Sequence, residues 1–262
     1  PEQIEKKAKD LKKKNIILIL NSPNNPSGSN CKNFEEIANI AKKYEIIILS
    51  DEIYTELTFD REYKSISKYY PEGTIISSGL SKWCGAGGWR LGFFAVPKKK
   101  NSILKMLTTL SSESFTAVSS PIQFAAIEAF EGDYSDYLNK TTGILDGVGN
   151  YVYETLKSNK ILIQKPQGGF YLMPEFLNSK FKTSSEMCDD ILKKSGVALL
   201  PGSDFGFKST RMLARLSYTD FNGEVFLNNI KSGKKPDAEA IKKYAPNVVE
   251  GTKKLVDWAK SL

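Results

Sequence analysis

Residues 77–92 carry the sequence SSGLSKWCGAGGWRLG, directly after a short apolar segment. Glycine and small hydroxyl residues let a backbone approach an anion closely, and the guanidinium of Arg90 can grip a phosphate through two parallel hydrogen bonds. Lys82 lies in the middle of this stretch, where its amine could form an imine with a phosphorylated aldehyde. The alternative is a solvated lysine in a glycine-rich loop, and both interpretations fit this stretch taken alone.

Two upstream segments also place polar residues just after apolar runs. Asn25 lies in the turn that follows the run at 16–20, and Asp51 comes shortly after the run at 46–49. Continuous apolar runs of this length are typical of buried strands joined by helices. Ligands of such sheets bind at the carboxyl ends of the strands. We therefore expect Asn25, Asp51 and Lys82 to lie at the same end of the sheet.

The rest of the chain alternates between apolar runs and amphipathic patterns, which indicates a sheet covered by helices and then a second, compact α/β layer. Asn33 and Glu36 are spaced to cap the helix that they begin, whereas Gly143, Gly147 and Gly149 weaken a later helical pattern. We expect helices at 2–13, 33–44, 101–111, 121–131, 134–156, 184–194, 222–231 and 237–261, and strands at 16–20, 46–50, 74–77, 93–96, 161–163, 169–173, 197–200 and 212–217.

Three motifs in order give the chain a family resemblance: NSPNNPSG at 21–28, LSDEIY at 49–54 and the stretch at 77–92. Here the chain resembles the pyridoxal-phosphate-dependent aminotransferases of class I and II, of fold type I, from its first residues to about Ser217. The resemblance implies an α/β fold, with a three-layer, mostly parallel sheet in a large cofactor-binding domain at 1–135. An interdomain helix and a smaller α/β domain would occupy 136–262.

The resemblance also implies pyridoxal 5′-phosphate as cofactor and a role for each motif residue. Lys82 would carry the cofactor and move a proton between substrate and cofactor. Asp51 would keep the ring nitrogen protonated, and Glu52 is the neighbour most easily confused with it. Tyr54 and Asn25 would donate to the phenolic oxygen of the ring. Taken singly, Asp51 and Asn25 could be turn residues and Tyr54 a half-buried strand residue.

Phosphate binding falls to Arg90 and Ser78 in the resembled family, with Ser81 as a further helper. The family often places a serine or threonine three or four positions before the lysine. Here Gly79 occupies the nearer position and Ser78 the farther one, so the sequence departs from the pattern at one of the two places.

Substrate binding would use Arg215, which matches the arginine that holds the α-carboxylate through a bidentate pair, together with Asn25. Arg211 is the competing candidate, and a surface salt bridge would account for it equally well. We favour Arg215 because 212–217 is expected to be a half-buried strand, in which an arginine needs a partner. The segments GGFY at 168–171 and LPGS at 200–203 resemble parts of the small domain near the substrate entrance, although packing alone would explain both.

Composition narrows the class of protein. The 262 residues are 40% hydrophobic and 26% charged, with a net charge of +7 from lysines that scatter over expected helical surfaces. We therefore expect a soluble protein that binds neither nucleic acid nor membrane. The chain contains no histidine, which excludes histidine-dependent nucleophiles and histidine metal sites. Cys31, Cys84 and Cys188 are widely spaced, so we expect reduced thiols, a cytoplasmic location and no metal.

The leading functional hypothesis is an aminotransferase homodimer that moves an amino group from an amino acid to a 2-oxo acid by a ping-pong mechanism through Lys82. One alternative is a lyase of the same fold, including chemistry of the aminocyclopropane-carboxylate synthase kind. Another is the aminotransferase-like sensor domain of a transcription regulator. The family's phosphate loop, ring-stacking aromatic residue and cross-dimer tyrosine would precede Pro1, so we expect this sequence to be part of a longer polypeptide.

Overall fold

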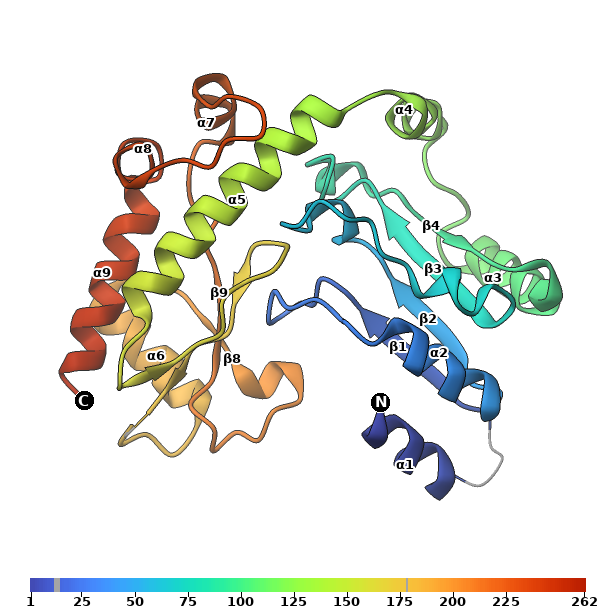
Figure 1. The fold of residues 1–262 in the computed structure, drawn as a ribbon, viewed down its shortest axis with the longest axis horizontal. Coiled ribbons are helices and arrows are strands. Elements are labelled where there is room, and N and C mark those ends of the chain that lie inside the picture. Colours follow the sequence, from blue (N-terminus) through green and yellow to red (C-terminus); the bar gives the residue numbers. More distant parts are fainter. Residues whose placement is uncertain (12–14, 178) are drawn as a thin grey trace. The chain divides into compact units, whose positions relative to one another are not determined.

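The computed structural model describes residues 1–11, 15–177 and 179–262, and these divide into two compact units (Figure 1). Unit 1 consists of Pro1–Ser22, Cys31–Glu56 and Glu62–Asp133. Unit 2 consists of Tyr134–Leu262 together with two short excursions of the N-terminal half, Pro23–Asn30 and Leu57–Arg61.

Unit 1 is built on a four-stranded sheet in the order β1-β2-β3-β4. The first three strands are parallel and β4 is antiparallel to β3, which confirms the predicted mostly parallel α/β sheet. The register pairs Asn21 with Asp51, and Asp51 with Ser77. Three polar residues thus lie side by side at the carboxyl end of the sheet. The strands are β1 (Ile17–Asn21), β2 (Ile47–Asp51), β3 (Thr74–Gly79) and β4 (Gly92–Ala95).

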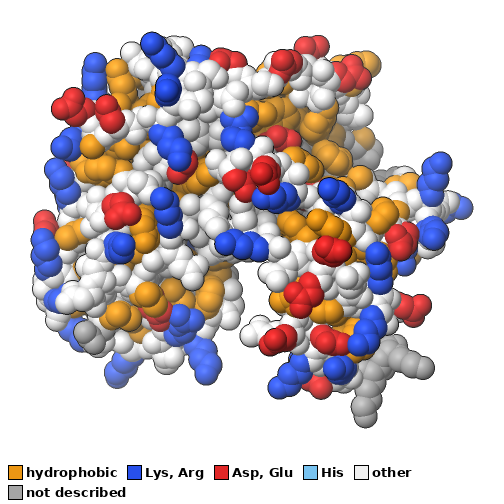
Figure 2. Space-filling view, in the orientation of Figure 1, with side chains coloured by type: hydrophobic (Ala, Val, Ile, Leu, Met, Phe, Trp, Pro, Cys, Tyr) orange, Lys and Arg blue, Asp and Glu red, His pale blue; other side chains and the backbone are white. Residues whose placement is uncertain are grey.

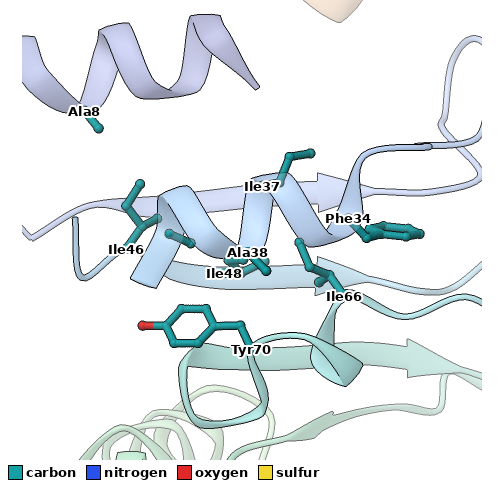
Figure 3. Close-up of a cluster of buried hydrophobic side chains, with 9 residues drawn as sticks. Ala8, Phe34, Ile37, Ala38, Ile46, Ile48, Ile66 and Tyr70 are labelled. Carbon is teal, nitrogen blue, oxygen red and sulfur yellow. The ribbon is translucent and has the colours of Figure 1, made fainter. Parts of the chain in front are cut away.

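One face of this sheet is covered by α1 (Glu2–Asp10) and α2 (Phe34–Lys43) (Figure 3). Ala38 and Ile48 are fully buried between helix and sheet, and burying one such isoleucine contributes about 1.5–3 kcal/mol. Asn33 occupies the predicted N-cap position of α2, and its Nδ2 donates to Glu36 Oε2 at 3.2 Å. The end of the helix predicted at 2–13 falls partly on 12–14, outside the described residues.

Apolar side chains on the outer strands and on two helices of unit 1 are exposed. The run at 16–20 forms a strand, but the expectation that it is buried is wrong for Ile17 and Ile19, which are 63% and 68% exposed. Within the described residues, α3 (Asn101–Ser114) buries no side chain, and α4 (Ser120–Glu131) buries Ala126 alone. Figure 2 shows hydrophobic side chains at the surface around α4.

Unit 2 is organised around α5 (Ser135–Leu156), the long helix that the sequence predicted in spite of its glycines. A Cβ at Gly147 would lie 2.6 Å from the ring of Pro236, and one at Gly149 would lie 2.7 Å from the hydroxyl of Tyr218. These glycines therefore allow close packing against other parts of unit 2, which offsets their low helix propensity.

Short antiparallel strands pack beside α5. β6 (Tyr171–Leu172) pairs with β9 (Ala214–Ser217), β9 pairs with β8 (Leu200–Pro201), and β5 (Ile161–Leu162) pairs with β7 (Glu175–Phe176). The strand expected at 197–200 begins only at Leu200. The other helices are α6 (Ser184–Ser195), α7 (Gly223–Asn229), α8 (Ala238–Tyr244) and α9 (Pro246–Lys260).

The single helix expected at 237–261 is wrong, because two helices occupy this segment. Ala245 separates α8 from α9 with φ −128° and ψ 51°, and Pro246 begins α9. A proline disfavours helical geometry in the residue before it but suits the first turn of a helix. Among the described residues, none of the helices is both long and apolar enough to cross a membrane.

Candidate active site

Asp51 lies at the carboxyl end of the unit 1 sheet, where neighbouring strands fix its position. Asn21 Nδ2 donates to the backbone oxygen of Asp51 at 3.1 Å, and the N–H of Ile53 donates to the carboxylate at 3.4 Å. Burial raises the pKa of Asp51, while hydrogen bonds from Ile53 and the Ser77 hydroxyl lower it and the charge of Glu52 raises it. A half-buried carboxylate of this kind favours a cationic ligand.

Tyr54 and Lys82 meet at the same end of the sheet. Tyr54 is 4% exposed, and Lys82 Nζ lies 5.7 Å from the centre of its ring. The backbone after Tyr54 is fixed because Thr55 Oγ1 donates to the carbonyl of Ser22 at 3.1 Å. The structure therefore places the amine of Lys82 over the face of Tyr54, as in a cation–π pair.

The loop that follows β3 folds back on itself and explains the departure at Gly79. A Cβ at this position would lie 2.5 Å from the carbonyl oxygen of Leu91, so the close approach of β3 to the chain before β4 requires glycine. Arg90 has φ 56°, in the left-handed region, and its Nη1 donates to the carbonyl of Gly87 at 2.7 Å.

Ser78 and Arg90 line the same groove of unit 1, together with Ser77 and mostly apolar side chains of β4, α3 and α4. The groove has a volume of about 1090 Å³. Ser81 is half-buried in the following loop and is not one of the described residues that line this groove. The structure thus brings together two of the three residues expected to bind phosphate.

The Asn-Pro-Ser-Gly turn belongs to unit 2. Ser27 Oγ donates to Asn24 Oδ1 at 2.8 Å, and the N–H of Gly28 donates to the carbonyl of Asn24 at the same distance. Gly28 has φ 67°, and a Cβ there would lie 2.5 Å from the carbonyl of Tyr171. Glycine is therefore required both by the turn and by its packing against the start of β6.

Arg215 lies on β9 and contacts this turn within unit 2. Its Nη1 donates to Asn25 Oδ1 at 2.9 Å, and its guanidinium lies 4.5 Å and 4.9 Å from the ring centres of Tyr171 and Phe205. The competing Arg211 is exposed and donates twice to Glu175, at 2.9 and 2.6 Å. The carboxylate of Glu175 thus engages Arg211 in a bidentate pair, whereas the guanidinium of Arg215 lies close to two aromatic rings and to Asn25.

Sequence reasoning missed Ser77, Tyr171 and Phe205 as residues that support the site. Ser77 could have been found because it ends the strand predicted at 74–77, as Asp51 directly follows the one predicted at 46–50. Tyr171 lies in the segment at 168–171, and Phe205 comes two residues after the segment at 200–203; both segments resemble parts of the small domain near the substrate entrance. Among the described residues, no group of three or more histidine, cysteine, aspartate or glutamate side chains could hold a metal ion.

The expected site residues are divided between the two units. Unit 1 carries a carboxylate, a phenol, an amine and the groups expected to bind phosphate: Asp51, Tyr54, Ser78, Ser81, Lys82 and Arg90. Unit 2 carries Asn25 and Arg215. Within unit 1 these groups can hold a cation and an anion, and Lys82 can supply a nucleophilic amine. Within unit 2, Arg215 can hold a carboxylate.

The chain belongs to the family described as aminotransferase class I and II, whose model matches residues 1–227. This membership confirms the resemblance drawn from the three sequence motifs. The chain is 37% identical over 190 residues to the "Probable N-acetyl-LL-diaminopimelate aminotransferase" of Bacillus subtilis (strain 168), covering 72% of this chain and 47% of that protein. An aspartate aminotransferase of Bacillus sp. (strain YM-2) is 34% identical over 216 residues, covering 78% of this chain and 53% of that protein.

A solved alanine aminotransferase from Pyrococcus furiosus has a similar structure. It matches with a TM-score of 0.79 and 29% identity, covering 99% of this chain and 61% of that chain. The chain therefore spans about half the length of the curated relatives that it matches and somewhat more of this solved structure.

Proposed function

We propose that this chain acts in an aminotransferase that moves an amino group from an amino acid to a 2-oxo acid by a ping-pong mechanism. The observation that carries the proposal is the placement of Asp51, Tyr54 and Lys82 at one end of the unit 1 sheet. Membership in the class I and II family supports it. Unit 1 would then serve as the cofactor-binding domain and unit 2 as the smaller domain.

The residue types present fit pyridoxal 5′-phosphate. The half-buried carboxylate of Asp51 suits a protonated ring nitrogen, and the Ser78 hydroxyl and the Arg90 guanidinium are groups that can bind a phosphate. Tyr54 would donate to the phenolic oxygen, and so would Asn25 from unit 2. When bound, the cofactor supplies an electron sink that stabilises negative charge at the substrate Cα.

Lys82 has two tasks in this proposal. Its amine would provide the covalent attachment point for the cofactor, and Nζ would then move a proton between the substrate Cα and the C4′ carbon of the cofactor. The ring of Tyr54 limits where the amine can lie, because Nζ is over its face. Positioning of this kind favours proton transfer along one path.

Arg215 would bind the α-carboxylate of the substrate. Its contacts with the Tyr171 and Phe205 rings and its hydrogen bond to Asn25 restrict the guanidinium, and a restricted guanidinium is suited to bidentate recognition. The relatives are named for aspartate, alanine and N-acetyl-LL-diaminopimelate. These substrates share an α-amino acid group, and we propose the same class for this chain.

We also propose a homodimer in the cytoplasm. The exposed apolar side chains of α3 and α4, such as Met106 and Phe124, support association because monomeric proteins rarely leave large apolar patches uncovered. The free thiols of Cys31, Cys84 and Cys188 support a reducing compartment. Sedimentation as a monomer at micromolar concentration would contradict the dimer.

The decisive test is to locate the covalent attachment. The intact protein, loaded with pyridoxal phosphate and reduced with borohydride, should carry one cofactor adduct on Lys82 by peptide mass analysis. Lys82→Ala should abolish both the adduct and amino transfer. Adduct formation at another lysine, or undiminished turnover in Lys82→Ala, would refute the proposal. Release of ammonia and an oxo acid, in place of amino transfer to a second oxo acid, would favour the lyase alternative.

A further inference from the structure

A second carboxylate lies next to Asp51 in the sequence and is buried. Glu52 is 5% exposed, and both of its carboxylate oxygens accept hydrogen bonds. Ser50 Oγ and Ser65 Oγ donate to Oε1 at 2.8 and 2.6 Å, and the Tyr63 hydroxyl donates to Oε2 at 2.5 Å. Three hydroxyl groups from two segments of unit 1 therefore surround one carboxylate.

These contacts settle which of the two adjacent carboxylates can face a ligand. Ser50 and Glu52 lie two residues apart and are hydrogen-bonded to each other, so their side chains share one face of the chain. Asp51 lies between them and interacts instead with Ser77 on the neighbouring strand. The carboxylate of Glu52 is thus held by hydroxyl groups on one face of the chain, whereas the carboxylate of Asp51 lies on the opposite face, where it could contact a ligand.

The three donors to Glu52 are neutral hydroxyls, so they hold the carboxylate in place without cancelling its charge. A backbone hydrogen bond also fixes the position of Glu52, because its N–H donates to the carbonyl of Ser77 at 2.8 Å. A fixed negative charge in a partly buried environment acts on its neighbours more strongly than one in water.

We propose that Glu52 is a positioning residue for the cofactor, whose fixed negative charge strengthens the hold of Asp51 on the protonated pyridine nitrogen. The inference rests on the proposed function and deepens it. It assigns to Glu52 an indirect electrostatic role through Asp51, with no contact to the cofactor. It also gives the segment around Tyr63 and Ser65 a function, because this segment supplies two of the three hydroxyls.

The groups that face the two carboxylates make the direction of the effect definite. For Asp51, burial and the charge of Glu52 raise its pKa, and the donors Ile53 and Ser77 lower it. Around Glu52, the pKa of Tyr63 is raised by burial first, then by its hydrogen bond to Glu52 and by the charges of Glu52 and Glu56. Removing the charge of Glu52 should therefore lower the pKa of Asp51 and weaken the binding of a cation beside it.

The test compares Glu52→Gln with Glu35→Gln, which removes the same charge from the exposed surface of α2. In the cofactor-free chain, a carboxyl titration followed by NMR, with Asp51 assigned by Asp51→Asn, should show a lower pKa for Asp51 in Glu52→Gln only. In absorbance titrations with pyridoxal phosphate, Glu52→Gln should bind about three- to tenfold more weakly, because one nearby negative charge no longer attracts the protonated ring nitrogen.

Two results would overturn the inference: an unchanged pKa of Asp51 in Glu52→Gln, or cofactor affinity equal to that of Glu35→Gln. Wild-type protein that binds no pyridoxal phosphate at all would instead refute the proposed function, and the NMR titration distinguishes the two failures. If Glu52→Gln does not fold, the double variant Tyr63→Phe with Ser65→Ala removes two donors and keeps the charge. It should bind the cofactor about two- to threefold more weakly, because the carboxylate of Glu52 is no longer held in one position by these two hydrogen bonds. Wild-type affinity would contradict the inference.

Discussion

Two helices of similar apolar content, α3 in unit 1 and α5 in unit 2, differ completely in burial. Within the described part of the chain, α3 has no buried residue, whereas α5 has nine, among them Leu156 and Val152. Leu110 of α3 is 63% exposed and Leu156 of α5 is fully buried. The comparison shows that an apolar stripe in the sequence predicts a helix, but does not predict whether another part of the chain packs against that stripe.

The largest expected change in stability that tests this contrast comes from replacing one leucine of each helix by alanine. Leu156→Ala should lower the free energy of unfolding by about 2–5 kcal/mol, because it leaves a cavity in the packed interior of unit 2. Leu110→Ala should change it by less than about 0.5 kcal/mol at concentrations low enough to keep the protein monomeric. Urea denaturation measures both. Equal losses would show that α3 is buried in solution.

The second effect concerns the tight contacts of α5. Gly149→Ala should cost about 1–3 kcal/mol by overpacking, because the added Cβ would lie 2.7 Å from the Tyr218 hydroxyl. The matched control is Gly88→Ala in unit 1, where a Cβ would meet nothing within 4 Å. Thermal unfolding should separate the two variants. A Gly149→Ala protein as stable as Gly88→Ala would mean that helix propensity outweighs packing here.

A smaller effect, of opposite sign, is expected at Asp51. Burial raises the pKa of this carboxyl above its unfolded value, so its contribution to stability is fully present below the unfolded pKa and is lost as the pH rises through the folded pKa. Asp51→Asn should therefore raise the melting temperature of the cofactor-free chain slightly at pH 7. The difference should vanish toward pH 3. A destabilised variant at neutral pH would contradict this account.

The smallest effect on stability should come from a substitution among the exposed apolar side chains of α4. Phe124 is 72% exposed on α4, so Phe124→Lys should change the free energy of unfolding of the dissociated monomer by less than about 0.5 kcal/mol. It should nevertheless reduce self-association, because it places a charge in an apolar patch. Sedimentation velocity over a range of concentrations measures this change. Unaltered association would show that another surface joins the copies.

The sequence was sufficient for much of the fold because local patterns set it. The apolar runs predicted both ends of β1, β2 and β3 to within two residues. The helix α5 was also predicted correctly, although glycines weaken its helical pattern. Exposure was harder to predict, as Ile17 and Ile19 show, because a continuous apolar run does not reveal whether another element covers it. The break at Pro246 was missed even though a proline inside a helical pattern signals it.

The candidate site shows the same limit. Strand ends and motifs pointed to Asp51 and Lys82 without any knowledge of tertiary contacts. The choice between Arg211 and Arg215 rested on an expected strand, and the contacts with Glu175 and Tyr171 depend on segments far away in the sequence. The hydroxyls around Glu52 come partly from the segment at 63–65, which no motif covers. Such contacts form only when the chain folds, so sequence patterns alone do not reveal them.

The excursions Pro23–Asn30 and Leu57–Arg61 restrict how this protein can be taken apart. The carbonyl of Gly28 accepts from the N–H of Gln167, and the carbonyl of Leu57 accepts from the N–H of Gly169. A polypeptide that ends at Asp133 would contain both excursions but would lack Gln167 and Gly169, which donate to them. It would also contain Asn25 without Arg215, its hydrogen-bond partner. Fragment complementation, limited proteolysis or circular permutation would therefore have to respect the threading of the polypeptide, because no single cut separates the units cleanly.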